Sequence, residues 1–173
     1  VAAVNDAPVI DGDSIVVQEM DEDSNVAPLL ELSLFTTDVE TTDSQLLTYE
    51  VVDTNAEEVE CGISGSAPYY IDFTSAENFN GETSCTVKAN DGEADSNIVT
   101  LSISVAAVND APEITSTAAT SANEDENYVY SVIVEDVDGD DITYELTTYP
   151  EGMEINGNGV IVWKPTDQQL GNH

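Results

Sequence analysis

The chain has 173 residues, of which 36 are Asp or Glu and only two are Lys or Arg, so the formal net charge is −34. Such a charge excludes nucleic acid and anionic membrane surfaces as partners, because binding either requires Lys and Arg. Self-repulsion opposes folding of so acidic a chain unless cations or salt offset it, but 40% hydrophobic residues and recurrent β-branched runs predict a folded chain rather than a disordered one.

The first ten residues, VAAVNDAPVI (Val1–Ile10), recur as VAAVNDAPEI (Val105–Ile114) with one substitution. A repeat of about 100 residues indicates a domain rather than a solenoid unit. Each copy has the pattern of a strand end, then Asn-Asp, then Ala-Pro and a new strand, since Pro favours extended backbone before it. We interpret both copies as joints between domains, and we expect a chain that starts inside a strand to be a piece of a longer protein.

Short β-branched segments separated by Gly, Asp, Asn and Ser clusters predict an all-β fold. In the first unit, strands are expected at Ser14–Gln18, Ala27–Phe35, Leu46–Val52, Glu58–Ile63, Tyr69–Phe73, Ser84–Ala89 and Asn97–Val105, with a hairpin signal at Asp91-Gly92. In the second unit, they are expected at Glu113–Thr117, Asn127–Val134, Ile142–Leu146, Met153–Ile155 and Val160–Trp163, with a turn at Asn156–Gly159. The last two strands of the first unit have no counterpart in the second, which predicts an open sheet edge there.

Cys61 and Cys85 are the two cysteines of the chain, and they do not form a metal-binding CxxC motif. A disulfide is favoured, since we expect an exported protein and disulfides persist outside the cell. By closing a mid-sized loop it would add about 2–4 kcal/mol to the free energy of unfolding. Two buried free thiols are the alternative.

Three motifs follow one another in the chain: the VNDAP joint, NFNG (Asn78–Gly81) before a strand, and NDG (Asn90–Gly92) after it. With D-x-D/E before L-x-Y-E-V, they resemble the cadherin-like repeats of bacterial surface adhesins and secreted polysaccharide-acting proteins. The second unit, with YVYSVIVEDVDGDDITYEL, PEGMEI and GVIVWKPT, resembles the dystroglycan-type cadherin-like subgroup, also described as an Ig-like domain.

The resemblance implies an all-β fold of tandem Ig-like or cadherin-like Greek-key β-sandwiches, the second truncated before its last two strands. Residues 1–7 would be the end of a preceding repeat and a linker, residues 8–108 the first sandwich, and residues 109–173 the incomplete second one.

The resemblance also implies Ca²⁺ as a cofactor, because in cadherin-type arrays calcium lies at the joints between successive domains. Ca²⁺ takes roughly 6–8 oxygen ligands, and a D-x-D motif at a strand end places both carboxylates on one face. The implied ligands of the central joint are Glu22, Asn109, Asp110, Asp136 and Asp138. Those of the N-terminal joint are Asn5, Asp6, Asp38, Glu40 and Asp91, completed by a Glu from another domain.

The first unit departs from the family pattern in two ways. An insertion, TTDSQ (residues 41–45), follows Asp38-Val-Glu40, and NFNG stands where the family has an acidic motif, so fewer ligands per site are expected. Ordinary turns, solvated strand flanks or a capped linker turn are alternative interpretations of these acidic residues, and a marine or halophilic surface would account for acidity elsewhere. The recurrence of the acidic sets at matched places favours metal binding, with Ca²⁺ preferred over the octahedral Mg²⁺.

Catalysis is not indicated, because the acidic residues lie at solvated joints and turns rather than in a pocket that raises one pKa. The single histidine, His173, is terminal, which excludes a Ser-His-Asp or Cys-His set. Trp163 and the tyrosines suit stacking on sugar rings, and alternation places Tyr128 and Tyr130 on one face. Alternatively, Trp163 belongs to the core of the second sandwich.

The sequence therefore predicts a non-catalytic, calcium-binding structural or adhesion module of a large secreted or cell-surface bacterial protein. Calcium and neighbouring repeats of the same protein are the expected partners, and Ca²⁺ would stiffen the joints. The alternatives are a pair of polysaccharide-binding modules, with polysaccharide or other cell-surface molecules as partners, and a subunit of an extracellular filament that takes strands from a neighbour. No membrane insertion is expected, since the chain lacks a run of about 18 apolar residues and does not begin with a signal peptide.

Overall fold

The computed structural model describes residues 4–24, 30–40, 46–169 and 171. Two compact units make up the chain, Val1–Val108 and Asn109–His173. The described residues form β-strands and short 3-10 helices without an α-helix, which confirms the predicted all-β class. The insertion at 41–45 and residues 27–29 of an expected strand lie outside the described residues. No helix among the described residues is long and apolar enough to cross a bilayer.

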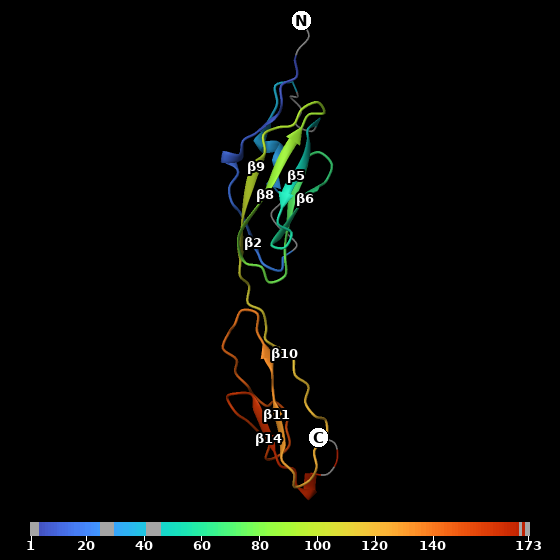
Figure 1. Ribbon diagram of the computed structural model, residues 1–173, viewed down its shortest axis with the longest axis vertical. Coiled ribbons are helices and arrows are strands. Elements are labelled where there is room, and N and C mark those ends of the chain that lie inside the picture. Colours follow the sequence, from blue (N-terminus) through green and yellow to red (C-terminus); the bar gives the residue numbers. More distant parts are fainter. Residues whose placement is uncertain (1–3, 25–29, 41–45, 170, 172–173) are drawn as a thin grey trace. The chain divides into compact units, whose positions relative to one another are not determined.

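The first unit is a sandwich of two sheets (Figure 1). Its larger sheet has the order β2 (Gln18–Asp21), β9 (Val99–Ala106), β8 (Gly81–Asn90) and β5 (Thr48–Thr54). Its smaller sheet has the order β3 (Leu30–Glu31), β7 (Tyr70–Ser75) and β6 (Val59–Ser64), and a separate short pair joins β1 (Val9–Ile10) to β4 (Thr36–Thr37). Strand β2 runs parallel to β9, whereas the other pairs in this unit are antiparallel.

Alternate residues of both sheets face one hydrophobic core. In β9, Val99, Leu101, Ile103 and Val105 are buried, and the residues between them are not. The smaller sheet contributes Ile71 and Phe73 of β7 together with Val59 of β6. This period-two pattern explains why a sequence of short alternating runs folds as a sandwich.

Two expected strands of the first unit are wrong in detail. The β-branched run Ser14–Gln18 does not form a strand, because the 3-10 helix η1 (Gly12–Ser14) precedes it and β2 begins only at Gln18. Val16 and Val17 are exposed and lie outside the paired strands. Within the run expected at Ala27–Phe35, a second 3-10 helix, η2 (Leu32–Phe35), replaces the last four residues of the strand and buries Leu32 completely.

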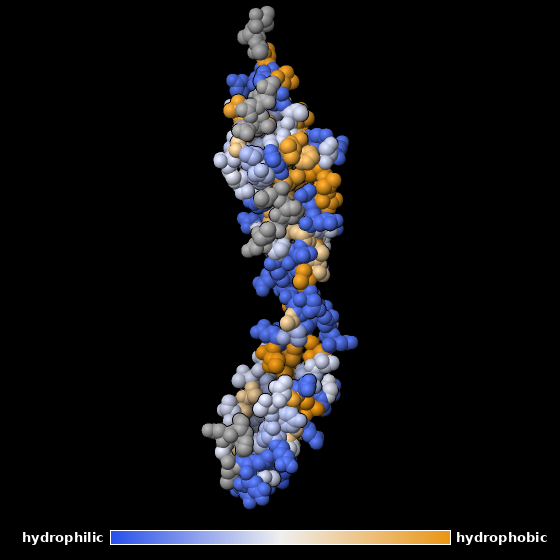
Figure 2. Space-filling view, turned by 180° about the vertical axis from the view of Figure 1, so that it is seen from behind, coloured by the Kyte–Doolittle hydropathy of each residue, from blue (hydrophilic) through white to orange (hydrophobic). Residues whose placement is uncertain are grey.

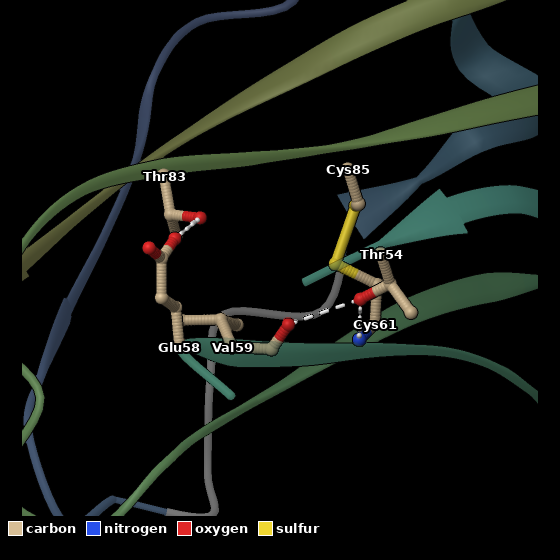
Figure 3. Close-up of a disulfide and its surroundings, with 6 residues drawn as sticks. All are labelled: Thr54, Glu58, Val59, Cys61, Thr83 and Cys85. Atoms are coloured by element: carbon tan, nitrogen blue, oxygen red, sulfur yellow. Dashed lines mark hydrogen bonds between the residues drawn. A yellow bond between two sulfur atoms is a disulfide. The ribbon is translucent and has the colours of Figure 1, made fainter. Parts of the chain in front are cut away.

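A disulfide between Cys61 of β6 and Cys85 of β8 connects the two sheets, which confirms the predicted bond (Figure 3). Both cysteines are buried in the core. Beside the bond, the Thr54 hydroxyl donates to the carbonyl oxygen of Val59 at 3.0 Å and accepts from the Cys61 backbone N–H at 3.2 Å. The link therefore crosses the core at a place where β5 and β6 are also joined by a side-chain hydroxyl.

The second unit contains two smaller sheets. One pairs β10 (Glu113–Ile114) with β12 (Val134–Glu135), and the other has the order β11 (Tyr128–Ser131), β14 (Val160–Trp163) and β13 (Glu154–Ile155). The 3-10 helix η4 (Asp167–Gln169) follows β14. The strand expected at Asn127–Val134 is interrupted at Val132-Ile133, where the Ile133 N–H and carbonyl bond to Ser116 and Thr115 instead. Residues 142–146 alternate in exposure as predicted for a strand but pair with no other strand among the described residues.

The second unit buries its hydrophobic residues less completely than the first. Among its described residues only Gly159 and Pro165 are buried, and Ile114, Val129 and Ile133 are more than half exposed. Hydrophobic patches (orange) accordingly appear on the visible face of this unit in Figure 2.

Replacing both cysteines, Cys61→Ala with Cys85→Ala, should lower the free energy of unfolding of the first unit by about 3 kcal/mol, because the unfolded chain regains the entropy of an open loop. The 24-residue separation of the two cysteines sets this expectation. Denaturant unfolding monitored by circular dichroism would measure it. Reductant should destabilise the unaltered protein and leave the variant unaffected, and equal sensitivity of both proteins would contradict a structural role for the bond.

Candidate metal centres at the linkers

In the first unit, the linker residues before β1 are attached to two acidic segments. The side-chain amide of Asn5 donates to Oδ2 of Asp91 at 2.9 Å, and the backbone N–H of Asp6 donates to Oε2 of Glu40 at 3.1 Å. Glu40 follows strand β4, whereas Asp91 lies in the loop between β8 and β9. The structure therefore brings four of the five residues predicted for the N-terminal joint into two contacts.

The loop after β8 holds Asp91 in place through its own backbone. Oδ1 of Asp91 accepts the N–H groups of Glu93 and Ala94, each at 2.7 Å, as in an Asx turn. The pKa of the Asp91 carboxyl is lowered, first by the N–H of Ala94 and then by the Asn5 amide and the N–H of Glu93. Asp91 is thus kept ionised, and its Oδ2 points to the linker. The turn that the sequence offered as an alternative is present and does not exclude a ligand role.

The second unit repeats the contact between linker and acidic motif. The backbone N–H of Asp110 donates to Oδ2 of Asp138 at 2.6 Å. Asp110 occupies the repeat position of Asp6, and Asp138 that of Glu40, so one backbone-to-carboxylate bond recurs in both units. Oδ1 of Asp136 accepts the N–H of Asp140 at 3.0 Å, which closes the acidic loop.

The remaining predicted residues are placed as follows. The side-chain amide of Asn109 donates to the backbone oxygen of Asp110 at 2.7 Å, and so it is held against its neighbour. Asp38 and Asp110 each bury one carboxylate oxygen. Neither residue belongs, among the described residues, to a group of three or more His, Cys, Asp or Glu side chains that could hold a metal ion.

Glu22 lies at the other end of β8 from Asp91 and is the only buried acidic residue among those described, at 4% exposure. Its Oε1 accepts the backbone N–H of Val108 at 2.7 Å, and its Oε2 accepts the side-chain amide of Asn80 at 3.2 Å. Both oxygens are therefore engaged within the first unit. The sequence predicted Glu22 as a ligand but not this pair of contacts.

The donor chemistry of these sets fits a hard cation, because carboxylates, side-chain amides and backbone carbonyls supply oxygen and neither His nor Cys is involved. Among the described residues, however, no three His, Cys, Asp or Glu side chains converge closely enough to hold a metal ion. The acidic residues occur instead as pairs with amides. They would supply part of a coordination shell, and additional oxygens would have to complete it.

Sequence reasoning missed the residues that support Glu22. Asp23 and Asn78 both have positive φ, 55° and 59°, and the N–H of Asn78 donates to Oδ1 of Asp23 at 2.9 Å. Asp125 in the second unit also has a positive φ of 60°. The available signal was the tendency of Asn and Asp to adopt the left-handed region, but NFNG was interpreted as the loss of an acidic motif.

Sandwich topology, an inter-sheet disulfide and acidic linkers define a class of Ig-like or cadherin-like β-sandwich repeats. Residues 5–104 match the family model described as "Bacterial Ig domain", and the chain belongs to this family. Residues 111–173 match the family described as "Putative Ig domain". A comparison with curated proteins finds no match.

Similar solved structures include protocadherin and desmocollin ectodomains and an endo-fucoidan hydrolase. The extracellular cadherin domains 1–4 of protocadherin gamma B7 are similar at 17% identity and a TM-score of 0.50, over 95% of this chain and 43% of that one. The human desmocollin-1 ectodomain is similar at 16% identity and a TM-score of 0.45, over 98% and 33%. An endo-fucoidan hydrolase of glycoside hydrolase family 107 is similar at 19% identity and a TM-score of 0.49, over 95% and 25%.

At 17% identity, the likeness to the protocadherin shows the fold alone. The chain spans between a quarter and less than half of the length of the three structures.

Asn5→Ala should raise the pKa of Asp91 without restoring its ordinary value of about 3.9, because the N–H groups of Ala94 and Glu93 still favour the ionised form. Carboxyl ¹³C shifts followed through an acid titration would measure the change. A lowered folded-state pKa means that the contribution of Asp91 to stability is present above the unfolded pKa and is lost as the pH falls through the folded one.

The pKa of Asp95 is the internal control for this experiment. It is lowered by the side-chain amide of Asn90 and then by Lys88, neither of which the substitution touches. The Asn5–Asp91 contact would be contradicted if both carboxyls titrated as they do in the unaltered protein.

Proposed function

We propose that the chain is a non-catalytic, calcium-dependent spacer of a secreted or cell-surface protein. In this proposal Ca²⁺ binds at the linkers and stiffens the joints between repeats. Asn5, Asp6, Asp38, Glu40 and Asp91 would serve one joint, and Asn109, Asp110, Asp136 and Asp138, with Glu22, would serve the next. Calcium-rich surroundings outside the cell suit sites of this kind, which often bind at about 10⁻⁴–10⁻³ M.

One observation carries the proposal: the backbone of a linker aspartate donates to the acidic motif of its own unit in both repeats, Asp6 to Glu40 and Asp110 to Asp138. The two units share this bond together with the acidic residues around it. The recurrence supports a shared requirement to gather oxygens at the start of each unit.

Charge balance supports the same conclusion. Lys88 pairs with Glu50 and Asp95 at 3.1 and 3.0 Å, and Lys164 lies 3.9 Å from Asp125. The chain contains no further Lys or Arg, so these side chains cannot neutralise the linker carboxylates. A bound divalent cation would remove the repulsion among them.

Calcium at 10 mM should stabilise the protein by about 1–3 kcal/mol relative to protein in chelator, as expected for binding to the folded state at 10⁻⁴–10⁻³ M. Thermal unfolding by calorimetry would measure the shift, with MgCl₂ and NaCl at matched ionic strength as references. Asp136→Asn with Asp138→Asn should remove much of the calcium effect. Coincident transitions with calcium and with chelator would refute the proposal.

The matched control is Glu154→Gln with Asp167→Asn. This variant loses the same two charges from exposed positions of the same unit that lie outside the predicted set. It should keep the full response to calcium. An equal loss of response in both variants would indicate a general charge effect in place of a site.

A second candidate function, polysaccharide binding, is favoured by a groove in the second unit. Its volume is about 410 Å³, and Tyr128, Met153 and Trp163 line it together with Glu124 and Gln169. Tyr128 and Trp163 are directly opposite one another on β11 and β14. Aromatic faces beside amide and carboxylate groups suit a neutral sugar, and a groove of this size fits a small ligand.

Affinity electrophoresis through neutral polysaccharides would test this candidate. Retardation of the unaltered chain that decreases in Trp163→Phe and Tyr128→Ala would support it. Tyr149→Ala provides the control, because Tyr149 is 54% exposed and does not line the groove. Absence of retardation on every polysaccharide would reject sugar binding and leave the calcium proposal untouched.

A further inference from the structure

The NFNG motif of the first unit contacts the buried carboxylate of Glu22. Asn80 donates its side-chain amide to Oε2 of Glu22 at 3.2 Å. Glu22 is 4% exposed, and the two lysines of the chain pair with other carboxylates. A buried carboxylate without a cation must be satisfied by hydrogen-bond donors, and Asn80 supplies one of them.

Each residue of the motif has a separate structural task. Asn78 adopts a positive φ, which aims its N–H at Asp23. Phe79 is partly buried and packs against the core, so it anchors the turn. Gly81 has a φ of 133°, which favours glycine, and it opens strand β8. Asn80 lies between Phe79 and Gly81, which fix the turn on both sides, and the turn therefore holds Asn80 next to Glu22.

Glu22 in turn holds the chain as it leaves the first unit. Its backbone N–H donates to the Ala106 carbonyl at 2.9 Å, which extends the parallel pairing of β2 with β9 by one bond. Its side chain then accepts the N–H of Val108 at 2.7 Å. The side chain of Glu22 thus continues the hydrogen bonding to the chain after the backbone pairing of β2 with β9 ends. The residue that it holds, Val108, is the last residue of the unit.

We propose that NFNG is a metal-independent latch, in which Asn80 positions the Glu22 carboxylate on the Val108 N–H and so sets the path of the chain leaving the first unit. Asn80 is a positioning residue and acts through Glu22. An acidic residue at position 80 would repel the Glu22 carboxylate, whereas a neutral amide donates to it. The inference deepens the proposed function, because it would orient one predicted calcium ligand before an ion binds.

The test is hydrogen exchange of the Val108 amide, measured by NMR on the full chain without calcium. Asn80→Ala should speed this exchange about tenfold, since a hydrogen bond to a charged group is lost. Asn80→Asp, which keeps the shape and replaces a donor by a charge, should speed it further. Exchange of the Leu101 amide in the core strand β9 should be unchanged in both, which separates release of the latch from general destabilisation.

A donor–acceptor swap makes the test more specific. In Glu22→Gln with Asn80→Asp, the new amide at position 22 would donate to the new carboxylate at position 80, and its carbonyl oxygen would still accept from Val108. The double variant should therefore recover slow Val108 exchange that Asn80→Asp alone loses. Its calcium affinity, measured by titration, should be lower than that of the unaltered chain, because the carboxylate at position 22 is gone.

Glu77→Gln is the matched control, since it removes one charge from an exposed position in the same loop. It should leave Val108 exchange as it is. Unchanged Val108 exchange in Asn80→Ala, or a failure of the double variant to restore it, would overturn the latch. If calcium had no effect on any variant while Asn80→Ala still freed Val108, the calcium proposal would fail and the latch would stand.

Discussion

A shortage of cations governs how this chain is held together. With 36 acidic residues and two lysines, few carboxylates can form an ion pair. They take their partners from amides instead: Glu40 and Asp138 from linker backbone, Asp91 from Asn5, and Glu22 from Asn80 and Val108. Hydrogen bonds to ionised acceptors are stronger than hydrogen bonds between neutral groups. Asparagine side chains and backbone N–H groups therefore stabilise carboxylates that Lys and Arg would stabilise in less acidic proteins.

This use of amides places the polar bonds at the ends of the first sandwich and leaves its centre apolar. Strand β8 spans ten residues, with the Asn80–Glu22 contact before one end and the Asp91 turn after the other. Between them, Cys85, Val87 and Ala89 are buried, and the disulfide to Cys61 crosses to the opposite sheet. One strand thus carries both the core and the supports of two linkers.

The alternation of short β-branched segments with turn residues was enough to predict the all-β class, since β7, β8, β9 and β14 each overlap a run that the sequence indicates. Alternation could not show that Leu32 enters the core from a 3-10 helix, or that Ile142–Leu146 pairs with none of the described strands, because both depend on partners distant in sequence. The acidic residues were predicted by motif and repeat position. Their amide partners were missed, because a carboxylate motif does not reveal its donors and the turn around Asn78 and Asn80 is set by backbone with positive φ.

The parallel alignment of β2 with β9 has a mechanical consequence. Once β1 had separated from β4, tension along the chain would pull the start of β2 at Gln18 and the end of β9 at Ala106 in opposite directions. Bonds across two parallel strands then bear load together and in shear, and they cannot open one at a time from an end. Glu22 lies just past this pairing, where its side chain and backbone add two bonds to the same row. The first unit therefore has its parallel pairing and the two Glu22 bonds at the place where tension on a tethered protein would act.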